Sequence, residues 1–111
     1  MQCNAIHWED LPWTPVRDGV ERKAITGEGA TVALHRLMPG NTPQPHKHPH
    51  EQIAYIMSGE VDFYVDGEPV RLRAGGMVVV PPDTMHYAVV VGDEPVMNLD
   101  IFTPKRPEYV A

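Results

Sequence analysis

The chain of 111 residues has one cysteine, no long apolar run and no cluster of basic residues. Cys3 can form no disulfide within the chain, and the first ten residues have neither the basic start nor the apolar stretch of a signal peptide. We therefore expect a cytoplasmic protein. No apolar run approaches the roughly 20 residues that a membrane-spanning helix needs, so no membrane association is expected.

Basic residues are also too few for nucleic-acid binding. The chain has 9 Lys and Arg against 15 Asp and Glu, a formal net charge of -6, whereas binding to phosphate backbones depends on clustered positive charge. Nucleic acid is therefore not expected as a partner. Net acidity does not exclude a small anionic ligand, because a buried cationic site can dominate its own pocket.

Long helical segments are absent, and short strand-like segments fill the chain. The 12 prolines and 9 glycines divide it into stretches rich in Val, Ile, Tyr and Thr, which favour strands. The expected strands are residues 19–25, 31–38, 52–57, 60–65, 69–72, 77–80, 86–91 and 96–103. Short strands at this spacing predict one all-β domain over residues 1–111, folded as a sandwich, jelly roll or barrel.

Two turn-forming pairs, Ser58-Gly59 and Asp66-Gly67, separate three of these strands. Such pairs are typical of hairpins, so residues 52–72 are expected to form a meander of three antiparallel strands. A domain this small is also expected to leave sheet edges open. The N-terminal residues 1–38 could cover such an edge on a second copy, which predicts a homodimer.

Three of the six histidines lie in the run His46-Lys47-His48-Pro49-His50-Glu51-Gln52. In an extended chain alternate side chains share a face, so positions 46, 48, 50 and 52 would lie on one side. Two imidazoles at this spacing can bind one metal ion, and His86, at the start of a later strand, can supply a third. Alternatively, the histidines lie on a solvated, proline-rich loop, as surface histidines commonly do.

The spacing of these residues resembles that of the cupin family, whose first motif is G(x)5HxH(x)3-4E(x)6G. The motif positions over residues 40–59 are occupied by Gly40, His46, His48 and Gly59. Gln52 stands where the family usually has glutamate. The resemblance implies a cupin double-stranded β-helix, which is a jelly-roll barrel.

The second cupin motif, G(x)5PxG(x)2H, is matched within residues 75–90. Gly75, Pro81 and His86 fit its spacing, and Asp83 replaces its last glycine. The two motifs together are far more specific than either alone, and they favour a metal site over a solvated loop.

The resemblance implies one divalent transition metal ion, and the implied ligands are His46, His48, Gln52 and His86. A bulge after His48 would present His50 or Glu51 to the ion in place of Gln52. Three neutral imidazoles and an amide leave the dipositive charge uncompensated, so a small anionic substrate is expected. Such ligands suit Fe, Mn, Co, Ni, Zn or Cu, and they do not choose among these metals.

The last expected strand carries an acid among apolar residues. Asn98, Asp100 and Phe102 share one face of this strand. A carboxylate beside a substrate at a metal site is a natural general acid or base, and the alternative is a structural ion pair of Asp100 with Arg106 or another arginine. His35 lies in a different apolar strand, where a hydrogen-bonded interior histidine is expected.

The ending LDIFTPKRPEYV, the stretch HPHEQIAYIMSGEVDFYVDGE and the turn PPDTMH resemble the KdgF-type uronate linearases of pectin and alginate breakdown. The resemblance extends to the N-terminal segments WEDLPW and GVERKAI. It implies a metal-dependent conversion of 4,5-unsaturated uronate monomers into linear keto forms. It also implies that Asp100 moves the proton, that Phe102 shapes the pocket, and that Arg106 contacts the substrate or orients Asp100.

Two other functions fit the same sequence. A cupin dioxygenase would need a redox-active metal with two adjacent open positions, and a non-catalytic binding module would need no acid in its pocket. An acid and an aromatic residue on one strand face favour an enzyme. Asp100 must then lie in the pocket.

Overall fold

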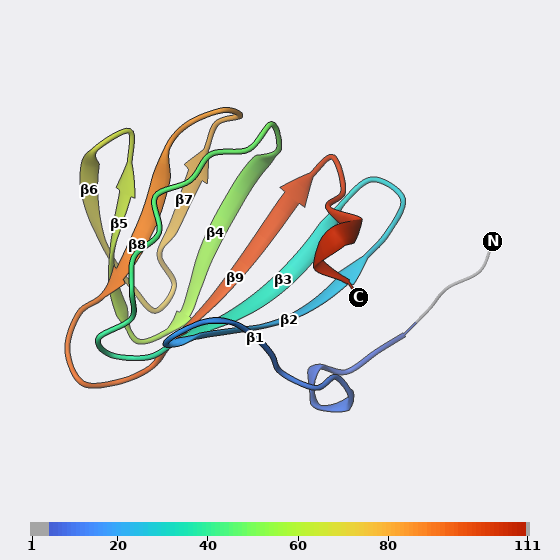
Figure 1. The fold of residues 1–111 in the computed structure, drawn as a ribbon, viewed down its shortest axis with the longest axis horizontal. Helices are drawn as coiled ribbons and strands as arrows, with labels where there is room; N and C mark the ends of the chain where they lie inside the picture. Colours follow the sequence, from blue (N-terminus) through green and yellow to red (C-terminus); the bar gives the residue numbers. More distant parts are fainter. Residues whose placement is uncertain (1–4, 111) are drawn as a thin grey trace.

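The computed structural model describes residues 5–110, and it consists mainly of two antiparallel sheets, with a long loop over residues 38–50 between β3 and β4 (Figure 1). The strands are β1 (Thr14–Arg17), β2 (Val20–Thr26), β3 (Thr31–Leu37), β4 (Glu51–Ser58), β5 (Glu60–Val65), β6 (Glu68–Arg73), β7 (Met77–Val80), β8 (His86–Val90) and β9 (Val96–Thr103). Two short 3-10 helices flank them, η1 (Trp8–Asp10) and η2 (Pro107–Tyr109). Within the described range, no helix is long and apolar enough to cross a membrane. Cys3 lies outside the described residues.

The larger sheet has the order β1-β2-β3-β9-β4-β7, and the smaller sheet has the order β6-β5-β8. The all-β prediction is confirmed, and each expected strand is found within one residue at either end. β1 is the strand that the sequence did not indicate. Pro15 lies in it, and proline is tolerated there because β1 is an edge strand with one side unpaired.

β4 and β5 do not pair, which corrects the expected meander of residues 52–72. β4 lies between β9 and β7 in the larger sheet, whereas β5 lies between β6 and β8 in the smaller one. The chain therefore passes from one sheet to the other at Gly59, which has a φ of 84°. A Cβ at Gly59 would lie 2.6 Å from the carbonyl oxygen of Pro95 and 2.9 Å from Cα of Val96, so this crossing requires glycine.

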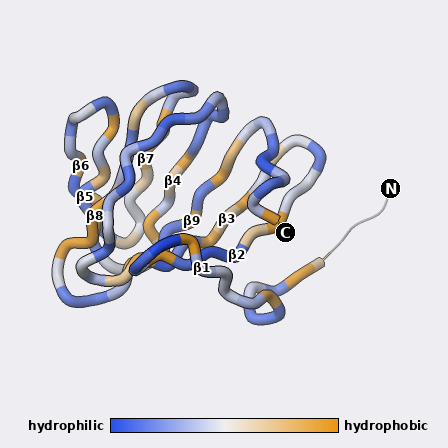
Figure 2. The backbone as a smooth tube through the Cα atoms, viewed as in Figure 1, coloured by the Kyte–Doolittle hydropathy of each residue, from blue (hydrophilic) through white to orange (hydrophobic). Residues whose placement is uncertain are grey.

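The apolar core lies between the two sheets. Its buried residues are Val20, Leu37, Ala54, Ile56, Val61, Phe63, Leu72, Val80 and Val96. Along β9 the buried positions alternate with partly exposed ones, and Figure 2 shows that hydrophobic and hydrophilic stretches both occur along the strands. The inward face of β9 changes from apolar Val96 to polar Asn98 and Asp100, which are also buried. The core therefore gives way to a polar interior along this strand.

The outer face of the larger sheet carries an apolar row across five strands. Cross-strand pairing joins Val79, Ile53, Ile101, Val32 and Ile25 in that order. Val79 and Ile25 at its two ends are exposed, and the three between them are partly exposed. β1, β2 and β3 extend this sheet within one chain. The homodimer expected from the sequence stays a prediction.

We expect Gly59→Ala to destabilise the fold more than Gly67→Ala does. Both positions have positive φ values, 84° and 81°, which cost an L-residue about 1–2 kcal/mol. Only Gly59 lacks space for a Cβ, since nothing lies within 4 Å of one built at Gly67. The added overlap should bring the loss at Gly59 to roughly 3 kcal/mol or more, measured by urea unfolding. Equal losses in the two variants would contradict a steric requirement at the crossing.

Candidate metal centre

Three imidazoles from two distant parts of the chain meet at one point. His46 and His48 lie in the loop before β4, and His86 is the first residue of β8. The backbone N–H of His46 donates to the carbonyl of His86 at 3.1 Å, and the N–H of His86 donates back at 2.9 Å. One candidate ligand atom from each of the three side chains lies within 4.8 Å of the other two. The cluster can therefore hold one ion.

A tight turn before β8 ties the two histidine-bearing segments together. The backbone N–H of Asp83 donates to the carbonyl oxygen of His48 at 2.7 Å. Asp83 has a φ of 58°, in the left-handed region that glycine adopts freely and aspartate tolerates better than most residues. This backbone conformation explains why aspartate can stand where the second cupin motif has glycine.

The backbone sets the orientation of all three rings. Each Nδ1 lies at hydrogen-bond distance from a backbone carbonyl: His46 from Gln44 at 2.8 Å, His48 from His50 at 3.0 Å and His86 from Thr84 at 2.8 Å. Because a carbonyl only accepts, each Nδ1 carries the proton and each Nε2 keeps a lone pair. Metal-binding histidines are usually oriented in this way. Nε2 of His86 is buried and has no hydrogen-bond partner in residues 5–110.

Gln52 is fixed between the histidine cluster and an acid. Its amide Nε2 donates to Oδ1 of Asp100 at 2.8 Å, and its Oε1 lies 3.0 Å from Nε2 of His48. The carboxylate accepts only from the NH₂ side of the amide, so the amide oxygen must face His48. Two lone pairs then face each other with no proton between them. A shared cation would remove this repulsion.

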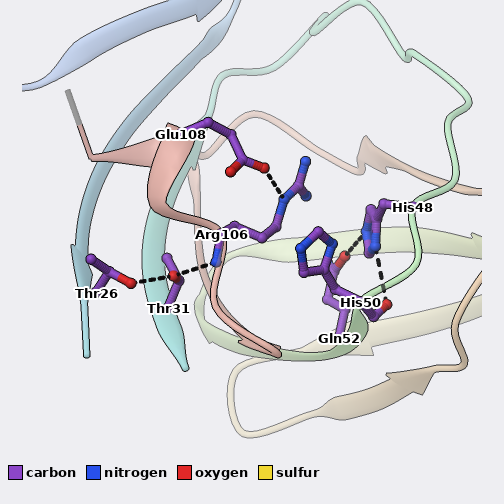
Figure 3. A network of polar contacts seen from close by, with 7 residues as sticks. All are labelled: Thr26, Thr31, His48, His50, Gln52, Arg106 and Glu108. Atoms are coloured by element: carbon purple, nitrogen blue, oxygen red, sulfur yellow. Dashed lines mark hydrogen bonds and ion pairs between the residues drawn. The ribbon is translucent and has the colours of Figure 1, made fainter. Parts of the chain in front are cut away.

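The two alternative ligands lie in different positions. Glu51 is exposed and pairs with Thr103 at the start of β4. His50 is not a member of the three-histidine cluster, although its carbonyl accepts from His48 (Figure 3). Gln52, in contrast, has a side-chain oxygen beside a nitrogen of the cluster.

The donor set fits a divalent transition metal ion, since imidazole nitrogen and amide oxygen are both suitable ligands. Burial lowers the pKa of His86 to about 4 and also holds the pKa of His48 below its usual value. Both imidazoles are therefore neutral near pH 7, which is the state that binds a metal. Because the buried Nε2 of His86 has no hydrogen-bond partner in residues 5–110, its lone pair is available to bind an ion.

Asp100 lies beside this cluster on β9. Its cross-strand neighbours on the two sides are Ala33 of β3 and Ala54 of β4, and its exposed fraction is 3%. The small alanine side chains leave space around the carboxylate. Asp100 and Gln52 line a cavity of about 230 Å³, together with His46 and His86.

The carboxylate of Asp100 is surrounded by nitrogen atoms. Oδ1 accepts from Gln52, and Oδ2 accepts from Nδ2 of Asn98 at 3.0 Å. Nδ1 of His35 also lies 2.8 Å from Oδ2, although the ring is not aligned for a hydrogen bond. In the described residues no ion pair joins Asp100 to Arg106. The contacts of Asp100 thus come from β3, β4 and β9.

Phe102 and Arg106 lie next to the cluster in different ways. Phe102 is buried, lines the cavity and packs edge-on to the His48 ring, with centroids 5.5 Å apart. The guanidinium of Arg106 lies 4.8 Å from the centroid of Phe102 and 4.0 Å from that of Tyr109. Its Nε donates to Glu108 at 3.4 Å (Figure 3). Arg106 therefore packs on these rings and is not one of the residues that line the cavity.

The sequence motifs do not indicate several of the cavity residues, among them Arg17, Arg22 and Tyr109. The strand pattern does indicate Arg22, because residues 20, 22 and 24 lie on one face of β2 and Val20 and Ala24 face inward. No sequence pattern indicates Tyr109, since η2 lies outside any periodic segment.

Comparison with known proteins gives matches along most of the chain. Residues 33–102 match the family described as Cupin domain. The pectin degradation protein KdgF of Dickeya dadantii is 31% identical over 104 residues, which cover 92% of this chain and 94% of that protein. The structure of KdgF from Halomonas sp. is similar with a TM-score of 0.88 at 28% identity, covering 96% of this chain and 98% of that one. Acireductone dioxygenase of Bacillus pumilus is 31% identical over 83 residues, which cover 70% of this chain and 47% of that protein.

The metal-free protein should lose stability as the pH falls from about 6.5 to about 4. His86 has a pKa of about 4 in the folded chain and near 6.5 when unfolded. Within this window the unfolded chain binds a proton that the folded chain does not, so acid favours unfolding. Urea unfolding at several pH values measures the decline.

The variants His86→Gln and His7→Gln isolate the contribution of His86 to this decline. His7 is exposed, with a side-chain exposure of 77%, and its replacement should leave the pH dependence unchanged. His86→Gln should decline less than the wild type over the same window. An unchanged decline in His86→Gln would show that another group is responsible.

Proposed function

The chain belongs to the cupin family and is a small single-domain cupin similar to KdgF over nearly its whole length, and from this premise we propose that it is a metal-dependent enzyme. Its reaction is the ring opening and tautomerisation of 4,5-unsaturated uronate monomers to linear keto forms. The observation that carries this proposal is the hydrogen bond between Gln52 and Asp100. It joins Asp100 to Gln52, whose oxygen adjoins His48, and both residues line the cavity that His46 and His86 also line.

The proposed reaction moves protons without net oxidation. As the bond between C1 and the ring oxygen breaks, the anomeric hydroxyl loses a proton and C1 becomes an aldehyde, which leaves an enol at C5. The enol becomes a ketone when its hydroxyl loses a proton and C4 gains one. A catalyst therefore needs a group that accepts and donates protons, and a means of stabilising negative charge on oxygen.

The side chains divide these tasks. A divalent ion held by His46, His48, Gln52 and His86 would supply Lewis-acid stabilisation of a substrate oxygen. Asp100 accepts the proton at a carboxylate oxygen and returns it to carbon. Gln52 and Asn98 hold the two oxygens of that carboxylate, which keeps the group in one orientation. Phe102, buried against the His48 ring, excludes water from that side.

A dioxygenase is the second candidate function, because the chain is also similar to acireductone dioxygenase. The aligned part spans less than half of that protein, whereas the similarity to KdgF spans nearly the whole of both chains. The uronate reaction is therefore preferred. Oxygen consumption by iron-loaded protein would support the dioxygenase instead.

The metal-loaded protein should accelerate formation of the linear keto product from freshly generated 4,5-unsaturated galacturonate, followed by proton NMR. Removal of the metal with a chelator should abolish the acceleration. Asp100→Asn should lower it by at least about a hundredfold, because general acid–base groups typically contribute that much, while leaving the metal bound. A rate equal to the spontaneous one, in protein shown to be fully metallated, would rule out this substrate.

The pair of Gln52 and Asp100 can be tested by exchanging the donor. Gln52→Glu replaces the N–H that faces Asp100 with a second carboxylate, which should destabilise the metal-free protein by about 2–4 kcal/mol. Adding Asp100→Asn restores a donor, so the double variant should recover stability but not turnover. Urea unfolding and the NMR assay measure the two effects. Equal stability of the single and double variants would contradict the assigned hydrogen bond.

A further inference from the structure

The N-terminal strands β1 and β2 form one wall of the cavity, and two arginines lie on this wall. Arg17 is the last residue of β1, and Arg22 faces inward from β2. Both are half-buried. Arg17 donates through Nε to the carbonyl oxygen of Thr42 at 3.0 Å. In the described part of the chain neither arginine forms an ion pair with a carboxylate.

Arg22 is held in place by an aromatic ring. Its guanidinium carbon lies over the Tyr109 ring, 3.7 Å from the centroid, and that of Arg106 lies 4.0 Å from the same centroid. Stacking uses the flat face of a guanidinium and leaves the N–H groups on its edge able to donate. Tyr109 thereby restricts the motion of Arg22 without satisfying its donors.

The charges around the cavity favour an added anion. Burial lowers the pKa of Arg17 and of Arg22 from the usual arginine value, yet a guanidinium remains charged near pH 7. Asp100 already accepts from two amides, and Glu108 pairs with Arg106. Within residues 5–110 these partly desolvated cations therefore have no carboxylate of their own.

We propose that Arg22, with Arg17 beside it, binds the carboxylate of the substrate. Arg17 and Arg22 line the same cavity as His46 and His86 of the cluster, so a small acid can reach both if its carboxylate is separate from the oxygens at the cluster. A guanidinium matches a carboxylate with two parallel hydrogen bonds. The proposal rests on the proposed function and names its ligand class, which is sugar acids in preference to neutral sugars.

A purely structural role for Arg22 makes a different prediction. If Arg22 only docks Tyr109 and η2 onto the sheet, its replacement lowers stability but leaves the preference for acids over neutral sugars unchanged. If it binds a carboxylate, its replacement removes that distinction even where the fold is intact. Relative affinity for the two kinds of sugar therefore separates the two roles.

The experiment measures binding of D-galacturonate and D-galactose to the full zinc-loaded chain by NMR titration. The saturated sugars lack the 4,5 double bond, so the result does not depend on turnover. The wild type should prefer the acid by roughly ten- to hundredfold, the range expected for hydrogen bonds to a charged group. Arg22→Gln should lose most of this preference, and Arg22→Lys should keep part of it because the charge remains.

Arg71→Gln is the matched control, since Arg71 lies on exposed β6 and pairs with Glu60 and Asp62. It removes the same charge and should retain the full preference. Equal or undetectable binding of the two sugars by the wild type would overturn the proposal, and so would an undiminished preference in Arg22→Gln. If the preference depends on Arg22 but no uronate is turned over, the proposed reaction fails and the subsite stands.

Discussion

The hydrogen bond from Gln52 to Asp100 is the contact on which the arrangement of the site depends. A side-chain amide has one donor group and one acceptor oxygen. Because the donor is used on Asp100, the oxygen is directed at Nε2 of His48. The two residues lie on the neighbouring strands β4 and β9, so sheet pairing sets their separation. A glutamate at position 52 would have no N–H to give, and the acid on β9 would then face a like charge.

The main chain performs the corresponding task for the histidines. Each Nδ1 is held by a carbonyl two residues away in sequence, so the ring orientation is set locally. The paired N–H and carbonyl groups of His46 and His86 then fix the distance between the two segments. The cluster is therefore organised before any ion arrives, and an ion need not order the loops around it.

The sequence predicts those features whose cause is local. Alternating residues and turn formers gave the strands of both sheets, and spacing brought His46, His48 and His86 together as candidates. The pair Ser58-Gly59 predicts a hairpin and not a crossing between sheets, because the cause of the crossing, the approach of Pro95 and Val96, is distant in sequence. The contact of His35 with Asp100 likewise depends on the register of β3 against β9, which no local pattern specifies.

The alternation along β9 also limits how such a chain can change over evolutionary time. Asn98, Asp100 and Phe102 point inward, while Leu99 and Ile101 lie on the opposite face. Inserting or deleting one residue early in this strand would exchange the two sets and bring leucine and isoleucine into the cavity. β9 is hydrogen-bonded on both sides, to β3 and to β4, so it cannot shift to absorb the change. Along β9, new chemistry must therefore arise by substitution, while gains and losses of length are confined to the loops.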